Sequence, residues 1–303
     1  MIIAITGSSG LVGTALIAAL EADGHLVRPI VRPQKHRGPR ADKHEIRWDP
    51  VAGTIDAAEL ASVDAVVHLA GENIAAKRWT ADFKNKIITS RAEPTKLLSQ
   101  TLAGLATPPS TLISASAIGY YGNRGDTPVD ETSPPGAGFL AEVCQQWEAA
   151  TAPARDAGIR VVNLRIGFVL ARHGGGLPQM LTPFKLGLGG VIGSGKQYMS
   201  WIALDDLVRA IQFNLSAANL KGPVNATSPN PVTNREFTKT LGRVLGRPTI
   251  FPVPAFAARL AFGEMADDML IGGARVEPRA LQSAGFEFAY PTLELALRHI
   301  LAT

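Results

Sequence analysis

Three glycines near the start of the chain have the spacing that phosphate recognition requires. Gly7, Gly10 and Gly13 stand between an apolar run, Ile2–Thr6, and a segment with helical periodicity, Leu11–Ala22. Such a turn lets a pyrophosphate approach the backbone, and the free N–H groups of the following helix attract its charge. The sequence therefore predicts a dinucleotide site. Its residues are Gly7, Ser8, Ser9, Gly10, Leu11, Val12 and Gly13.

The end of the second expected strand indicates which dinucleotide binds. In a fold of this kind, the residue that closes this strand, Leu26–Val31, meets the adenosine ribose, and an acid there would repel a 2′-phosphate. Here the residue is Arg32, whose guanidinium matches phosphate oxygens in charge and geometry, and the cations after it are Lys35, Arg37 and Arg40. The alternative is a solvated basic loop without a ligand. We predict NADP(H) rather than NAD(H).

Composition and charge exclude several classes of protein. The chain has 303 residues, 46% of them hydrophobic, and a formal net charge of only +4, without a basic stripe interleaved with aromatic residues. Nucleic acid is therefore not an expected partner. No apolar stretch is long enough to span a bilayer, so no membrane partner is expected. The single Cys144 excludes an intramolecular disulfide and favours a cytoplasmic location, and no Cys/His cluster has the spacing of a metal site.

Expected strands and helices alternate along the first half of the chain, which predicts an α/β fold with a doubly wound parallel sheet. Ligands then bind at the carboxyl ends of the strands. Pro94 lies inside one expected helix and predicts a kink or a restart there. The further expected strands are Glu45–Trp48, Ala65–Leu69, Thr111–Ala115 and Val161–Phe168, and the further helices are Thr80–Leu105 and Gly138–Ala157.

The pattern changes near residue 170, where glycine-rich loops begin. We therefore expect an NADP-binding domain over 1–170 and a smaller α/β substrate lobe over 171–303, with a segment at about 200–225 that crosses back to the first domain. Helical patterns return at Leu204–Leu215 and Asn234–Leu245. Arg172, His173, Lys185 and Lys196 fall in the expected lobe and suit an anionic substrate.

Several motifs together resemble the extended, epimerase-like branch of the short-chain dehydrogenase/reductase superfamily, over nearly the whole chain. A narrower similarity, to sugar-nucleotide epimerases of the YfcH type, rests on Gly222–Pro229 and on a short C-terminal domain of unknown function, here 247–297. The motifs of the wider resemblance are Thr6–Gly13, His68–Gly71, Ser114–Gly122, Arg165–Gly167 and Gly193–Asp206.

The resemblance implies a Rossmann fold and assigns further residues to the site. Ser116 corresponds to the serine that faces the substrate. His68 is expected to fill space at a strand end, and Cys144 to be a core thiol. The further residues that the resemblance places at the cofactor are Leu69, Ala70, Gly71, Arg91, Ser114, Ala115, Arg165, Ile166 and Gly167.

The catalytic pair of the superfamily, a tyrosine with a lysine four residues later, is missing. Phe139 and Val143 correspond to its positions, and Arg91 stands where an asparagine is usual. A phenylalanine cannot transfer a proton. None of the tyrosines of the chain, at positions 120, 121, 198 and 290, has a lysine four residues further on.

Three hypotheses follow. In the first, which we favour, the protein is an NADP(H)-binding, epimerase-like oxidoreductase in which Tyr120 or Tyr121 moves the proton, tuned by Glu142 and Arg91. In the second, hydride transfer is lost and the fold senses NADPH. In the third, water or an arginine-held acid protonates the substrate of a reductase. The expected substrate is small, a nucleotide sugar or another carbonyl compound. The apolar residues of the helices near 80–105 and 138–157 either form the interface of a homodimer or pack in the core of one chain.

Overall fold

A central, mainly parallel sheet organises the structure, a computed structural model that describes residues 1–32 and 45–302. In these ranges eight strands form this sheet in the order β12-β8-β6-β5-β1-β2-β3-β4, and only the β3–β4 pair is antiparallel. The doubly wound α/β prediction is confirmed. The strands are β1 (Ile2–Thr6), β2 (Leu26–Val31), β3 (Ile46–Asp49), β4 (Thr54–Ile55), β5 (Ala65–His68), β6 (Thr111–Ala117), β8 (Arg160–Ile166) and β12 (Gly222–Ala226).

The strand order indicates where a ligand crevice lies, at the carboxyl ends of β1 and β5. β1 pairs with β2 on one side and with β5 on the other, both in parallel. Successive strands are therefore added in opposite directions from β1, and the loops after β1 and β5 separate at their carboxyl ends. Open α/β sheets bind ligands at this switch point. The glycine-rich turn follows β1 directly, so it lies at this place.

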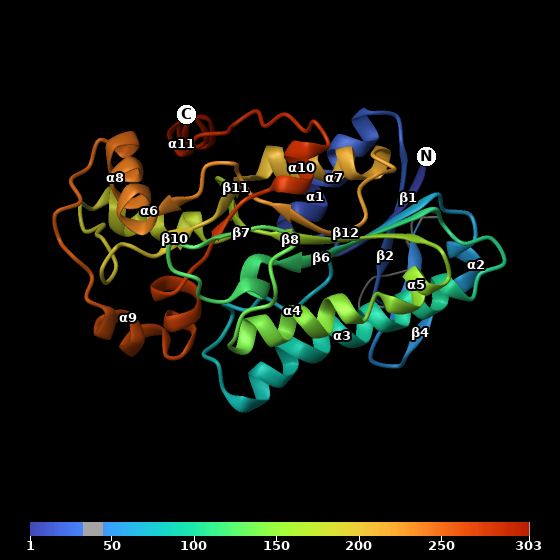
Figure 1. Cartoon of the computed structure of the whole chain (residues 1–303). Coiled ribbons are helices and arrows are strands. Elements are labelled where there is room, and N and C mark those ends of the chain that lie inside the picture. Colours follow the sequence, from blue (N-terminus) through green and yellow to red (C-terminus); the bar gives the residue numbers. More distant parts are fainter. Residues whose placement is uncertain (33–44, 303) are drawn as a thin grey trace, which may run out of the picture.

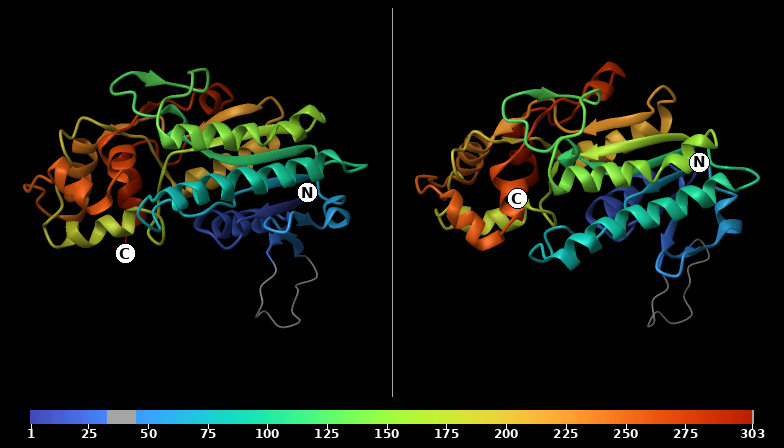
Figure 2. Two further views of the ribbon diagram at one scale, coloured as in Figure 1. Left: turned by 90° about the horizontal axis from the view of Figure 1, so that it is seen from below. Right: turned by 60° about the horizontal axis from the view of Figure 1, so that its bottom comes forward.

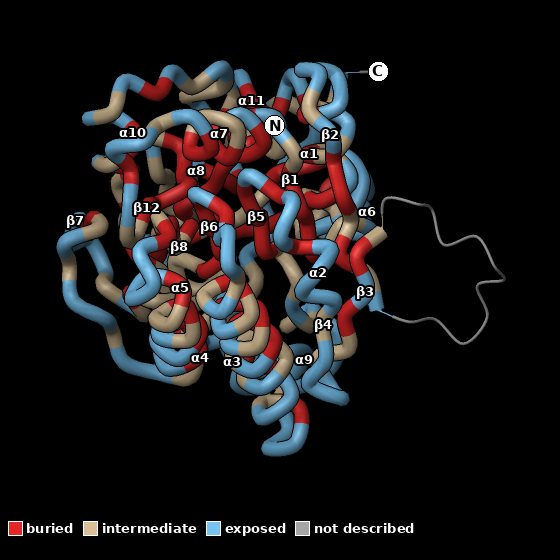
Figure 3. The backbone as a smooth tube through the Cα atoms, turned by 90° about the vertical axis from the view of Figure 1, so that its right-hand side faces the viewer, coloured by how far each residue is buried: buried red, intermediate tan, exposed pale blue. Residues whose placement is uncertain are grey.

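Helices cover both faces of the sheet (Figures 1 and 3). The alternation of side chains along β1 explains the two layers, because Ile3 and Ile5 belong to one apolar core and Ala4 to the other. One layer consists of α1 (Leu11–Ala22), α7 (Leu204–Ser216) and α10 (Arg279–Ser283). The other consists of α2 (Ala57–Leu60), α3 (Ala81–Ala103), α4 (Phe139–Ala149) and α5 (Ala152–Asp156).

Segments of the second half form a lobe at one end of the sheet, opposite the N-terminus (Figures 1 and 2). Its apolar core includes Trp201, Phe237 and Leu297, all fully buried. The domain boundary near residue 170 stays a prediction. The remaining elements are β7 (Pro128–Val129), β9 (Phe168–Leu170), α6 (Leu177–Lys185), β10 (Tyr198–Met199), β11 (Trp201–Ala203), β13 (Val232–Thr233), α8 (Asn234–Leu245), α9 (Ala255–Phe262), β14 (Arg275–Val276) and α11 (Leu293–Leu301), with a 3₁₀ turn at Ile118–Tyr121 and a π turn at Asp267–Ile271.

Two expected elements differ from the structure. The helix expected over Gly138–Ala157 is divided into α4 and α5, because Pro153 in the first turn of α5 has no N–H with which to continue α4. The strand expected over Val161–Phe168 breaks at Gly167, where a Cβ would lie 2.7 Å from the Ser200 carbonyl oxygen. By contrast, α3 runs through Pro94 as one helix.

None of the described helices is long and apolar enough to cross a membrane.

Candidate functional site

The glycine-rich turn after β1 has no room for side chains. A Cβ on Gly13 would lie 2.2 Å from the Gly7 carbonyl oxygen, and a Cβ on Gly7, whose φ is +67°, would lie 2.8 Å from the Leu69 backbone. Gly10 donates its N–H to the Gly7 carbonyl at 3.0 Å and is the N-cap of α1. The turn therefore presents bare backbone and the helix N-terminus to the crevice, as a pyrophosphate requires.

A buried hydrogen-bond chain fixes the turn to the neighbouring strand. Nδ1 of His68 lies 2.7 Å from Thr6 Oγ1, and its Nε2 lies 2.8 Å from Thr95 Oγ1. Thr6 Oγ1 also accepts the N–H groups of Leu69 and Ala70, at 3.0 and 3.1 Å. Because Thr95 donates its hydroxyl to the Arg91 carbonyl, it accepts from His68, which is then the Nε2–H tautomer.

Burial lowers the pKa of His68 to about 4. The ring is therefore neutral at pH 7, with both nitrogens in use. This arrangement agrees with the expected space-filling role of His68 and holds the loop Leu69–Gly71 beside the glycine turn.

Arg32 lies just past the carboxyl end of β2, on the strand next to β1, and its side chain is exposed. It is thus on the edge of the sheet where the glycine turn lies, as expected for a residue that meets an adenosine ribose. Lys35, Arg37 and Arg40 lie outside the described residues.

Arg91 is half-buried beneath the loop that follows β5. Its guanidinium donates to the Glu72 and Ile87 carbonyls, at 2.8 and 3.2 Å, and lies 5.0 Å from the ring centre of Trp147. A Cβ on Gly71 would approach it to 3.4 Å. Burial lowers the pKa of Arg91. The structure thus places Arg91 next to the loop expected to line the adenosine side, where it supports that loop.

Ser116 and Arg165 meet across neighbouring strands, because the register of β6 and β8 pairs them directly. Both side chains contact Glu148 of α4. Ser116 Oγ donates to Glu148 Oε1 at 2.7 Å, while Arg165 binds both carboxylate oxygens, with Nε and Nη2 each at 2.8 Å. The side chains of Arg165 and Glu148 are only 3% and 13% exposed. Although burial opposes the charged form, Glu148 raises the pKa of Arg165.

The two tyrosines lie on the other side of Arg165. Tyr121 is fully buried, and its hydroxyl accepts from Arg165 Nη1 at 2.9 Å and donates to Asn225 Oδ1 at 2.8 Å. Burial raises the pKa of Tyr121 to about 12, so its proton stays bound near neutral pH. Tyr120 is half-buried, with its ring centre 3.4 Å from the guanidinium carbon of Arg165. This geometry favours a structural role for Tyr121 and leaves Tyr120 as the more accessible phenol.

The face of α4 that meets β6 carries Leu140, Cys144 and Glu148. A Cβ on Gly119 would lie 3.1 Å from Leu140 and 3.7 Å from Cys144, and the Cys144 thiol donates to the Ala117 carbonyl at 3.5 Å. Phe139 and Val143 instead pack against α3. Leu140 and Cys144 therefore lie closer to the end of β6 than Phe139 and Val143 do, and the correspondence of Phe139 and Val143 with the tyrosine and lysine positions stays a prediction.

Leu140 and Cys144 cannot transfer a proton as a tyrosine and a lysine would. Burial raises the pKa of Cys144 to about 11, and the nearby Glu148 charge adds to that effect. Cys144 is a core thiol, as expected.

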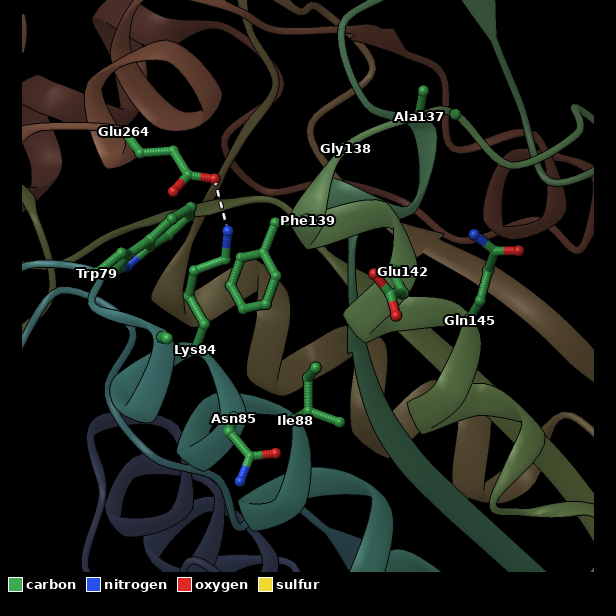
Figure 4. Close-up of a pocket in the computed structure, with 12 residues that line it drawn as sticks. Trp79, Lys84, Asn85, Ile88, Ala137, Gly138, Phe139, Glu142, Gln145 and Glu264 are labelled. Carbon is green, nitrogen blue, oxygen red and sulfur yellow. Dashed lines mark hydrogen bonds and ion pairs between the residues drawn. The ribbon is translucent and has the colours of Figure 1, made fainter.

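Glu142 does not join this cluster. Figure 4 shows it lining a groove on the outer surface between α3 and α4, of about 860 Å³, with Phe139, Trp79 and the Lys84–Glu264 ion pair. Glu142 accepts a hydrogen bond from Gln146 at 3.1 Å and is exposed. Six residues along a helix rotate a side chain by about 240°, which is why Glu148 faces Ser116 and Glu142 does not.

The remaining expected cofactor residues lie on β6 or β8 or directly after β8. Ser114 is fully buried, and its Oγ donates to the Ala115 carbonyl at 3.4 Å. Ala115 is also buried, while Ile166 packs on the core between the sheet and α7. Gly167 lies at the crossing with Ser200, where a Cβ would also lie 2.9 Å from Thr227 Cγ2. Ser114 and Ala115 therefore support the carboxyl end of β6 from within.

Glu148 is the residue of the site that sequence reasoning missed. Its spacing could have indicated its place, because Leu140, Cys144 and Glu148 are four residues apart and share one helix face. Glu148 is the charged member of that row.

This sheet, its glycine turn and its strand order define a nucleotide-binding fold of the NAD(P) type, with a second lobe at one end. The chain belongs to the NAD dependent epimerase/dehydratase family, whose profile matches residues 3–226; a domain of unknown function, DUF1731, matches 253–300. It is 51% identical over 296 residues to the epimerase family protein Mb2239 of Mycobacterium bovis, covering 98% of this chain and 96% of that one.

Human proteins are also similar. The chain is 37% identical over 305 residues to the human epimerase family protein SDR39U1, covering 100% of both chains. A crystal structure of human SDR39U1 (isoform 2) with NADPH superposes with a TM-score of 0.87 at 35% identity, covering 99% of both chains.

Proposed function

We propose that this protein is an NADP(H)-binding oxidoreductase that acts on a small carbonyl or nucleotide-sugar substrate. The observation that carries the proposal is the glycine cradle, in which a Cβ on Gly13 would fill the space beside the Gly7 carbonyl. The fit of that cradle to a dinucleotide agrees with the NADPH found in the crystal structure of human SDR39U1. Cofactor and substrate would meet at the carboxyl ends of β1, β5 and β6.

In this proposal each part of the crevice has one task. The backbone of residues 8–12 and the N-terminus of α1 hold the pyrophosphate. Arg32 pairs with the 2′-phosphate, and the loop Leu69–Gly71 lines the adenosine side. Ser116 and the turn Arg165–Gly167 flank the nicotinamide, which when bound supplies or accepts a hydride.

The proton then moves through Ser116. Its hydroxyl donates to Glu148 at 2.7 Å, so the lone pairs of Oγ remain available to a substrate hydroxyl. In oxidation, that hydroxyl gives its proton to Ser116 Oγ as Ser116 passes its own proton to Glu148; reduction reverses both transfers. Arg165 holds the carboxylate in place. Tyr120, the half-buried phenol beside Arg165, is the second candidate donor.

A second function, binding NADPH without turnover and signalling the bound state, is favoured by one specific observation. Leu140 and Cys144 occupy the face of α4 that meets β6, where neither can transfer a proton as a tyrosine would, and the Ser116 hydroxyl is already engaged by Glu148. In this function the Ser116–Glu148–Arg165 cluster is only a structural support.

The cytoplasmic location and a homodimer also remain proposals.

The two functions are separated by NADPH consumption, followed by absorbance across a panel of quinones, aldehydes, ketones and nucleotide sugars. For an oxidoreductase we expect turnover with at least one class and a loss of about 100-fold in kcat/KM in Ser116→Ala. The matched control is Ser110→Ala, just before the opposite end of the same strand. NADPH binding without consumption across the whole panel would overturn the enzyme proposal in favour of sensing.

A further inference from the structure

One end of the second lobe exposes large apolar side chains that the core does not use. We name this surface the apolar end. Each of its six residues is at least 56% exposed. They are Leu186, Leu188, Ile250, Phe251, Phe256 and Leu260. Soluble proteins rarely leave such a group uncovered without a binding role.

Two segments of the chain form the apolar end side by side. The Val253 N–H donates to the Val191 carbonyl at 2.8 Å, and the Gly193 N–H donates to the Val253 carbonyl at 2.9 Å. Leu186 and Leu188 therefore lie on the strip next to Ile250 and Phe251, just before this contact. α9 follows at once, and Phe256 and Leu260 are one helical turn apart on it.

The shape of the molecule leaves this surface accessible. α6, α8 and α9 lie together at the end of the molecule far from the N-terminus (Figure 1). A surface at a protruding end can meet a flat partner without collision with the central sheet.

Unpaired cations lie beside the apolar end, whereas Glu264 and Asp267, the acids that follow α9, form ion pairs with Lys84 and Arg259. Residues 157–204 and 237–263, which contain all six apolar residues, include no Asp or Glu. Lys185, Lys196 and Arg247 are exposed, and within the described ranges none of them forms an ion pair with a carboxylate. Lys185 directly precedes Leu186, and Arg247 lies three residues before Ile250.

We propose that the apolar end docks onto the surface of an anionic phospholipid bilayer. Its apolar side chains would enter the boundary between headgroups and acyl chains, while the three cations meet lipid phosphates. A second copy of the chain fits less well, because a symmetric pair would bring like charges together. This proposal departs from the expectation of no membrane partner. That expectation rested on the lack of a spanning segment, and surface docking needs no such segment.

The test is co-flotation of the full-length protein with vesicles of phosphatidylcholine alone or mixed equally with phosphatidylglycerol. We expect binding to the anionic vesicles only, weakened by salt. Phe256→Ser with Leu260→Ser should reduce the bound fraction at least about tenfold. The matched control is Val51→Ser, an apolar residue that is 95% exposed in the β3–β4 turn, and it should bind as wild type.

A second pair of variants tests the charge. Lys185→Glu with Arg247→Glu should remove the preference for anionic vesicles, whereas Lys221→Glu, at an exposed position just before β12, should retain it. Thermal unfolding shows that each variant is folded. No flotation, equal binding to both vesicles, or full binding by the apolar variant would overturn the proposal. So would a dimer of wild type that Phe256→Ser with Leu260→Ser converts to a monomer, since a second copy would then cover the apolar end.

Discussion

The two halves of the site differ in what builds them. The half around β1, β2 and β5 is made of backbone: Gly7 and Gly13 leave the turn bare, and Thr6 and His68 hold its neighbours. The half around β6, β8 and α4 is made of side chains, with Glu148 joining Ser116 to Arg165. Backbone geometry fails when one Cβ is added, whereas side-chain chemistry can be exchanged without moving a strand. This difference explains how the first half keeps the family pattern while the second is rebuilt.

The rebuilt half is held by a buried ion pair, so it should respond most strongly to the loss of one partner. In Glu148→Gln, Arg165 keeps its charge in a buried site without a carboxylate. We expect the free energy of unfolding to fall by about 3–5 kcal/mol, measured by urea denaturation. Glu142→Gln, exposed on the same helix, should change it by less than about 0.5 kcal/mol. Equal effects of the two variants would mean that the cluster does not support the fold.

The stability of the first half should be sensitive to acid, because His68 is buried in it. The folded pKa of His68, about 4, lies below its ordinary value of 6.5. The unfolded chain therefore takes up a proton first as pH falls, and stability present above pH 6.5 is lost down to pH 4. From that shift we expect a loss of about 3 kcal/mol.

Denaturation of wild type and His68→Gln at several pH values between 7.5 and 4 measures this contribution. The variant should lose less stability than wild type over the range. Parallel pH dependences would contradict a neutral, buried His68.

A methyl group added to the glycine turn should lower the affinity of the first half for NADPH. In Gly13→Ala the new Cβ would lie 2.2 Å from the Gly7 carbonyl oxygen, so the turn must shift away from the phosphate position. We expect NADPH affinity to fall about 100-fold, or about 2.7 kcal/mol. Gly104→Ala is the control, because its Cβ would meet nothing closer than 3.6 Å. Unchanged affinity in Gly13→Ala would place the dinucleotide elsewhere.

The smallest expected effect concerns the choice of cofactor. Arg32→Ala removes the guanidinium proposed to pair with the 2′-phosphate and should weaken NADPH binding about tenfold, while NADH affinity stays the same. Arg47→Ala, an exposed arginine on the neighbouring β3, should leave both affinities unchanged. If Arg32→Ala lowered the affinities for NADPH and NADH equally, Arg32 would not bind the 2′-phosphate.

Sequence patterns predicted the first half well, because its constraints are local. The glycine spacing, the strand before it and the helix after it are visible in a few consecutive residues, and β1, α1 and β2 have the expected bounds. The end of α4 was missed because Pro153 lies within an otherwise helical pattern.

The second half could not be predicted in the same way, because its contacts join residues far apart. Ser116 and Arg165 are paired by the β6–β8 register, and Glu148 reaches both of them from α4. Glu142 and Tyr121 were reasonable candidates by type. The rotation of α4 turns Glu142 outward, and Tyr121 is buried with its hydroxyl bound to Arg165 and Asn225.

The central claim is that the first half of the site binds NADP(H). It is tested most directly by titrating the purified protein with NADPH and with NADH and following nicotinamide fluorescence. We expect saturable binding of NADPH, about tenfold tighter than that of NADH. Binding of neither cofactor, or binding of NADH as tight as that of NADPH, would contradict it.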